Sequence, residues 1–434
     1  MSCQGQAVYQ PGPVAPDAGE VSINALDGIA SPPPGLAGSG PRWRPLRDLD
    51  RPGQLFTSIG PNWFASVMGT GIVATAAATL PVKPPGLHVF ATVFWLLAAA
   101  WLAVLTAAWA VHWIAHRANA RGHADNPVMA QYFGAPPMAL LTVGAGTLLF
   151  GPPLIGLRAA LLADAGLWAV GTITGLASSL AIPYLMFTRH RIGDGDAFGG
   201  WLMPVVPPMV SAATGALLIP HLPSGQPRLT MLLGCYAMFG LSLIASVIVI
   251  TTIWQQLVRY KPGPALMIPT LWIVLGPLGQ SITAVNGLGA VAHLALPYGY
   301  AAPFAVLGLV YGIPVWGFAA LWAALAAALT VRAARNRLPF GLTWWSFTFP
   351  VGTCVTGTSA LAAYTGATAF RWTAIAGYAA LVTAWAVVGA STARGAWRGR
   401  LFLPPSPAPQ PATQQRRPSV PKLVPPRSGS MCQM

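Results

Sequence analysis

Long apolar blocks follow one another along this chain, and short polar stretches separate them. Ten of the blocks approach the roughly 20 residues that an α-helix needs to cross a bilayer. They predict helices at about residues 57–79, 87–114, 136–156, 161–187, 200–220, 230–257, 265–289, 304–331, 341–364 and 372–392. We therefore expect an all-α integral membrane protein with ten transmembrane helices.

The composition supports a membrane protein and indicates where its membrane domain begins and ends. Of the 434 residues, 54% are hydrophobic and only 8% are charged, whereas about a quarter of an average soluble domain is charged. Residues 1–55 are rich in proline and glycine, and residues 394–434 are basic and rich in proline. We expect these two stretches to be disordered cytoplasmic tails on either side of a membrane domain at residues 56–393.

Charges in the predicted loops indicate the orientation. Nine lysine and arginine residues lie in the loops after the even-numbered segments, and four lie in the loops after the odd-numbered segments. Cytoplasmic loops carry the excess of positive charge, so both termini are expected in the cytoplasm, which requires an even number of spans. The same bias accounts for the basic isoelectric point, so we do not predict a nucleic-acid partner.

The odd-numbered segments share a proline that recurs about every 70 residues. These prolines are Pro61, Pro137, Pro208, Pro277 and Pro350, at intervals of 76, 71, 69 and 73 residues. Such a period predicts five helical hairpins, with the odd helices lining a central pore and the even helices facing lipid. The alternative is chance, because proline and glycine are common in transmembrane helices, and Pro183 and Pro314 fall in even segments.

The ninth segment has the most unusual composition. Pro350 lacks an N–H group, so the carbonyl of Ser346 loses its helical partner. A membrane tolerates such a break where the segment is buried in protein or lines a water-filled cavity. Phe349 directly precedes the break. A phenylalanine in a membrane helix usually serves packing, but this context makes Phe349 the candidate pore gate.

Other side chains of the odd segments are candidates for lining a pore. They are Phe64, Ser66, Thr70, Thr142, Ser211, Thr214, Ser281, Thr283, Phe347, Thr353 and Thr356, and helix breaks are predicted at Pro137, Pro208, Pro277 and Pro350. Hydroxyl groups and the N–H groups at helix N-termini donate hydrogen bonds and therefore favour an anion. A single hydroxyl more often bonds to its own helix, so this prediction depends on the set.

Acidic residues indicate the mode of transport. All nine lie in predicted tails or loops or at a segment edge, where Asp164 is placed. Coupled carriers usually keep ionisable groups inside the membrane, so we expect passive conduction. A proton-coupled exporter would need Asp164 or a histidine at the end of a span.

We find no constellation for catalysis, metal or cofactor binding, and expect no enzyme. A protein that acts through its proline-rich tails is a further alternative.

Residues 62–72 (NWFASVMGTGI) and 344–350 (WWSFTFP) together resemble the tellurite-resistance/dicarboxylate transporter family, over about residues 57–392. This family includes malate permeases, sulfite efflux pumps and slow-type anion channels. The resemblance implies five hairpins around a pore, a homotrimer in the plasma membrane, and Phe349 as the plug. It also implies a small anionic substrate: a C4-dicarboxylate such as malate, sulfite or an inorganic anion.

Overall fold

The computed structural model describes residues 46, 48–49 and 55–403, and within this part the regular structure is entirely helical. The predicted tails therefore lie mostly outside the described residues. The all-α prediction is confirmed for the part that the structure describes. One predicted boundary differs, because the last long helix continues past residue 393 to Arg398.

Five long helices form the outside of this part. They are α2 (Leu87–Ala115), α6 (Leu157–Thr188), α8 (Gln226–Tyr260), α10 (Tyr298–Arg335) and α12 (Thr368–Arg398). Only 17–33% of the residues in their most apolar windows are buried. Apolar side chains such as Ile244 and Val310 are instead exposed. Helices of this length and composition suit a lipid environment.

Five shorter helices lie inside. They are α1 (Phe64–Thr79), α4 (Ala135–Phe150), α7 (Pro207–Leu218), α9 (Leu275–Val291) and α11 (Phe349–Thr365). A 3₁₀-helix precedes each one: η3 (Pro61–Trp63), η4 (Met129–Gly134), η5 (Gly199–Leu202), η7 (Ala265–Val274) and η9 (Leu342–Phe347). In the segments Met129–Phe150 and Ala265–Leu294, which include α4 and α9, the most apolar windows are 72% and 78% buried. The inner segments therefore differ from the outer ones in both burial and continuity.

Each of the ten predicted segments overlaps one of these ten helices. Among the described residues, seven helical segments are long and apolar enough to cross a membrane, whereas α1, α7 and α11 are too short by themselves. The short helices α3 (Arg117–Asp125) and α5 (Pro152–Ile155) lie in connections.

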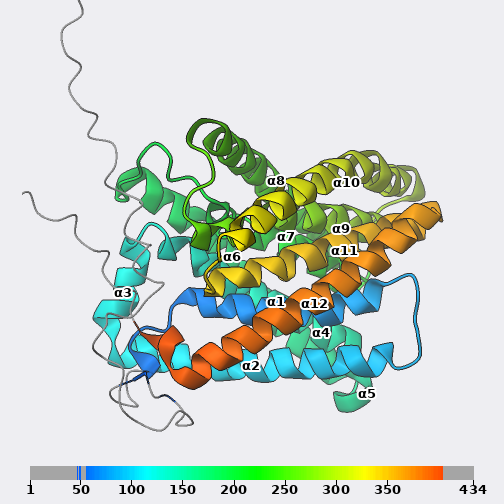
Figure 1. Cartoon of the computed structure of the whole chain (residues 1–434). Helices are drawn as coiled ribbons and strands as arrows, with labels where there is room; N and C mark the ends of the chain where they lie inside the picture. Colours follow the sequence, from blue (N-terminus) through cyan, green and yellow to red (C-terminus); the bar gives the residue numbers. More distant parts are fainter. Residues whose placement is uncertain (1–45, 47, 50–54, 404–434) are drawn as a thin grey trace, which may run out of the picture. The chain divides into compact units, whose positions relative to one another are not determined.

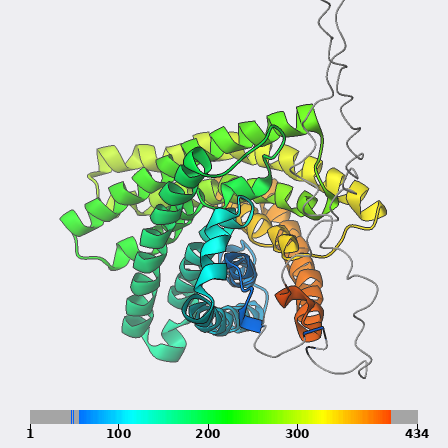
Figure 2. The same ribbon diagram turned by 90° about the vertical axis from the view of Figure 1, so that its left-hand side faces the viewer.

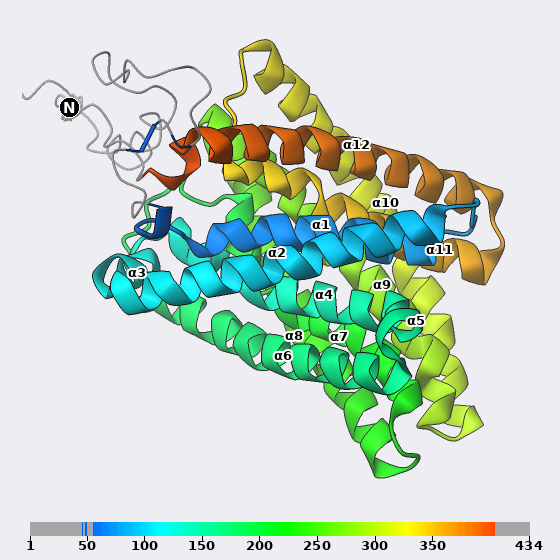
Figure 3. The same cartoon turned by 90° about the horizontal axis from the view of Figure 1, so that it is seen from below.

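The inner helices form a closed ring. Each packs against two others in the cyclic order α1, α4, α7, α9, α11 and back to α1. Each outer helix packs against the inner helix that precedes it in the chain and against the next one round the ring. Figure 1 shows α9 and α11 between α10 and α12, and Figure 3 shows α1 beside α2. Figure 2 looks nearly along α1, which is coloured blue.

Glycine allows a close approach of two helices in this ring, between α9 and α11. A Cβ atom added to Gly279 would lie 2.4 Å from the backbone nitrogen of Cys354. Gly357 of α11 is similarly close, because its added Cβ would lie 2.8 Å from the carbonyl oxygen of Gly279. Backbone atoms cannot move aside as a side chain can, so both positions require glycine.

Replacing Gly279 with alanine tests this packing. We expect the variant to lose about 1–3 kcal/mol of stability, the usual cost of overfilling a packed interior, and its thermal unfolding midpoint in detergent to fall. Gly234→Ala in α8 is the matched control, since no atom lies within 4 Å of the added Cβ there. Equal midpoints for the two variants would show that α9 and α11 are not in such close contact.

Candidate functional site

Two cavities lie along the inside of the ring. The larger has a volume of about 500 Å³, and its lining comes entirely from α1, α4, α7, α9 and α11. The smaller has a volume of about 20 Å³, which is room for about one water molecule. It lies where the 3₁₀-helices meet the inner α-helices, and its lining includes Met68, Met138, Met203 and Pro277.

Phe349 borders both cavities. It lines both of them, and among the described residues it is the one residue that the two linings share. Its side chain is only 2% exposed. Phe349 is the first residue of α11, so the start of this helix fixes its place beside both cavities.

Proline accounts for the position of these helix starts. Pro208 and Pro350 are the second residues of α7 and α11, and Pro137 and Pro277 are the third residues of α4 and α9. The first turn of a helix does not use its N–H groups within the helix, so proline fits there without losing a bond. The predicted breaks therefore coincide with the transition from 3₁₀-helix to α-helix. The first turns of α4, α9 and α11, which carry partial positive charge, contribute residues to the lining of the small cavity.

Four of the predicted lining residues do line the large cavity: Thr142, Thr214, Thr283 and Thr356. Their hydroxyl groups already have partners. Thr142 donates to the carbonyl of Met138 at 2.7 Å, and Thr283 and Thr356 share a hydrogen bond of 2.7 Å. These hydroxyls can still accept a hydrogen bond, but a ligand would compete for their protons.

Four other predicted residues line neither cavity and contact outer helices. Ser66 accepts a hydrogen bond from Trp101 at 2.7 Å, Thr70 from Trp385 at 3.0 Å, Ser211 from Thr172 at 3.0 Å and Ser281 from Tyr311 at 2.8 Å. These bonds connect inner helices to α2, α12, α6 and α10. In this structure the hydroxyls hold the two layers of helices together.

The remaining predicted residues also lie outside both cavity linings. Phe64 packs edge-on against Trp109, and Phe347 packs edge-on against Trp272. Thr353 donates to the carbonyl of Pro350 at 2.7 Å. Each of these side chains therefore has a packing or hydrogen-bonding partner within the fold.

Two polar side chains that the sequence did not single out lie in the large cavity. Gln280 is 5% exposed, and its amide makes no hydrogen bond within the described residues. The hydroxyl of Ser359 is also buried without a partner in that part of the chain. Both groups line the large cavity without a protein partner, so they are available to a ligand or to water. The sequence could have identified Gln280, because a polar amide side chain stands out inside an apolar segment.

Positive side chains bind the C-terminal end of two inner helices, where the large cavity ends. Lys83 donates from Nζ to the carbonyl oxygens of Ala77 (3.1 Å) and Ala78. Arg228 donates from Nε to the carbonyl oxygen of Leu222 at 2.8 Å, directly after the 3₁₀-helix η6 (Ile219–His221) that follows α7. Partial burial lowers the pKa of Lys83. Both cations offset the negative end of a helix dipole. Neither cavity lining contains a charged side chain.

Asp164 corrects one expectation from the sequence. It was placed at a segment edge, but it lies inside α6 and is 1% exposed. Its carboxylate has no hydrogen-bond partner in the described part, and an added Cβ on Gly144 of α4 would lie 2.7 Å from its Oδ1. The helix begins at Leu157, earlier than predicted, which places Asp164 in its third turn. The residue lies outside both cavity linings.

Gln280→Met provides a test of the unpartnered amide. Replacing an amide that has no protein partner with an apolar side chain of similar size should raise the stability by up to about 1 kcal/mol, seen as a higher unfolding midpoint in detergent. Thr283→Val is the control, because it removes hydrogen bonds that exist and should lower the midpoint. A lower midpoint for Gln280→Met would show that the amide is already satisfied.

Comparison with known proteins identifies relatives over most of the chain. Residues 58–393 match the family described as SLAC1, voltage-dependent anion channel. A sulfite efflux pump, SSU1, of Trichophyton rubrum is 29% identical over 305 residues, which cover 69% of this chain and 80% of the pump. An uncharacterized transporter of Methanocaldococcus jannaschii, MJ0762, is 25% identical over 343 residues, or 79% of this chain and 96% of that protein.

Proposed function

We propose that this anion transporter, which belongs to the SLAC1 family of voltage-dependent anion channels, conducts small anions through the centre of its helical ring. In this proposal the side chain of Phe349 closes the path. The observation that carries the proposal is that Phe349 lines both of the cavities inside the ring. If the phenyl ring of Phe349 moved aside, the two cavities would join into a continuous path.

The lining favours anions that move without a coupled ion. Neither cavity contains a carboxylate to attract cations or a basic side chain to trap an anion. Donors are supplied by Gln280 and Ser359 and by the N-terminal ends of the inner helices, which carry partial positive charge. An anion would therefore be bound weakly enough to leave again, as conduction requires.

We propose ten membrane spans arranged as five hairpins. The three inner helices that are short by themselves become long enough when their preceding 3₁₀-helices are included. The excess of positive charge in loops after the outer helices supports cytoplasmic termini, which puts the small cavity on the cytoplasmic side of Phe349. A homotrimer in the plasma membrane rests on the family resemblance alone.

The relatives suggest the substrate class. Sulfite efflux pumps are among them, and we propose sulfite as the first anion to test, followed by C4-dicarboxylates such as malate and by inorganic anions. Proton-coupled export is the second candidate. The buried, unpartnered carboxylate of Asp164 supports it, because such groups inside membrane proteins often take part in proton transfer.

Replacing Phe349 with alanine tests the plug. In liposomes that contain the purified protein, we expect anion flux to rise at least about ten-fold, because the side chain that separates the cavities is removed; a barrier reduction of about 1.4 kcal/mol suffices. The fluxes of chloride, nitrate, sulfite and malate would give the selectivity order.

Phe347→Ala is the matched control for this test. It removes the same side chain two residues away, from a position that lines neither cavity, and should leave flux at the wild-type level. Equal flux in Phe349→Ala and the wild type, with both proteins folded, would return Phe349 to a packing role. Flux that appears only with a pH gradient would favour the coupled exporter.

A further inference from the structure

Tyr132 places a free hydroxyl in the small cavity. The residue belongs to η4 and is 5% exposed. Its hydroxyl is buried and has no hydrogen-bond partner among the residues that the structure describes. Phenylalanine would fill the same space without leaving a polar group unpaired, so packing alone does not explain a tyrosine here.

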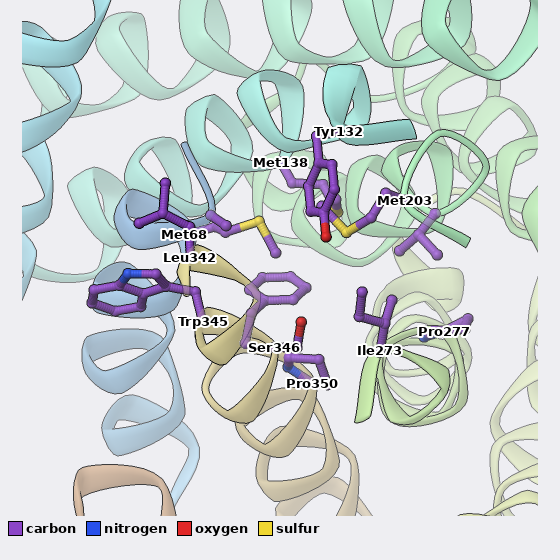
Figure 4. A pocket seen from close by; sticks show the side chains of 14 residues that line it. Met68, Tyr132, Met138, Met203, Ile273, Pro277, Leu342, Trp345, Ser346 and Pro350 are labelled. Carbon is purple, nitrogen blue, oxygen red and sulfur yellow. The ribbon is translucent and has the colours of Figure 1, made fainter. Parts of the chain in front are cut away.

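Ser346 contributes a second hydroxyl to the same cavity. It lies in η9, is 8% exposed and makes no side-chain hydrogen bond within the described part. Figure 4 shows the oxygen atoms of Tyr132 and Ser346 pointing into the pocket from opposite sides. Two donors from separate elements therefore converge on one small space beside Phe349.

The rest of the pocket is apolar and adaptable. Met68, Met138 and Met203 come from three different parts of the ring and all line it. Methionine side chains change shape easily because they are unbranched and flexible. With a volume of about 20 Å³ the pocket cannot hold an anion larger than a water molecule while Phe349 fills its present place. Displacing the phenyl ring of Phe349 would enlarge the pocket.

We propose that Tyr132 and Ser346 form an anion subsite on the cytoplasmic side of Phe349, which holds a singly charged oxyanion such as nitrate or hydrogensulfite as it passes the plug. This subsite rests on the proposed function. The two hydroxyl groups donate to two oxygen atoms of the anion. No cation lines the pocket, and the cost of burying an ion grows with its charge, so the subsite discriminates against dianions.

The test uses the open background of Phe349→Ala in liposomes, with nitrate, chloride and the malate dianion as probes. We expect Tyr132→Phe to reduce nitrate flux about ten-fold, since a hydrogen bond to a charged group is lost. Chloride flux should fall less, because a spherical ion does not need two fixed donors. Ser346→Ala should act in the same direction, and malate should pass more slowly than nitrate throughout.

Tyr236→Phe is the matched control. Tyr236 also has a buried hydroxyl without a partner in the described residues, but it packs against Phe239 and Phe304 and lines neither cavity. Its removal should leave the flux of every probe unchanged.

The outcomes separate the two proposals. If Phe349→Ala conducts no anion, the proposed function fails. If it conducts nitrate and neither Tyr132→Phe nor Ser346→Ala changes the ratio of nitrate to chloride flux, the subsite is overturned. Should Tyr132→Phe fail to fold, Ser346→Ala alone decides. Faster passage of malate than of nitrate would contradict the selection for single charge.

Discussion

Backbone hydrogen bonding is the constraint on which the rest of this structure depends. In hydrocarbon every N–H and C=O group needs a partner within the protein, so lipid-facing segments must be continuous helices. The outer helices are continuous over 29 to 38 residues each, and they lose backbone hydrogen bonds only at Pro183 of α6 and at Pro303 and Pro314 of α10. The inner segments are surrounded by protein and can change from 3₁₀-helix to α-helix along their length. Irregular backbone is therefore confined to the ring, where the two cavities lie.

The change of helix type organises the proposed path. Residues at or beside the starts of all five inner α-helices line the small cavity, so the positive ends of these helices gather around it. Phe349 lies at the start of α11. Their negative ends surround the far end of the large cavity, where Lys83 and Arg228 bind free carbonyl oxygens. Fixed dipoles can thus favour an anion along the ring without a charged lining. Four buried hydroxyls of the inner helices, those of Ser66, Thr70, Ser211 and Ser281, instead bond to outer helices.

Hydropathy alone predicted the all-helical fold and the approximate place of each long helix. It could not show which face of an inner helix points inward, because a helix covered by protein on all sides has no apolar stripe. Ser66 and Thr70 were therefore grouped with Thr142, although they contact outer helices. Tyr132 fell outside the segment predicted at residues 136–156, since η4 is not strongly apolar. The burial of Asp164 was not predicted, because α6 begins at Leu157, within residues that the hydropathy pattern assigned to a loop.

The central claim is that Phe349 alone divides one path through the ring. Thiol accessibility in sealed vesicles tests it most directly, with single cysteines at Gln280 and Ser346, a membrane-impermeant anionic thiol reagent, and the unsubstituted protein as background. We predict that each cysteine reacts from one side only, that the two sides are opposite, and that adding Phe349→Ala makes both react from either side. Reaction of both cysteines from the same side, or no change with Phe349→Ala, would contradict the account.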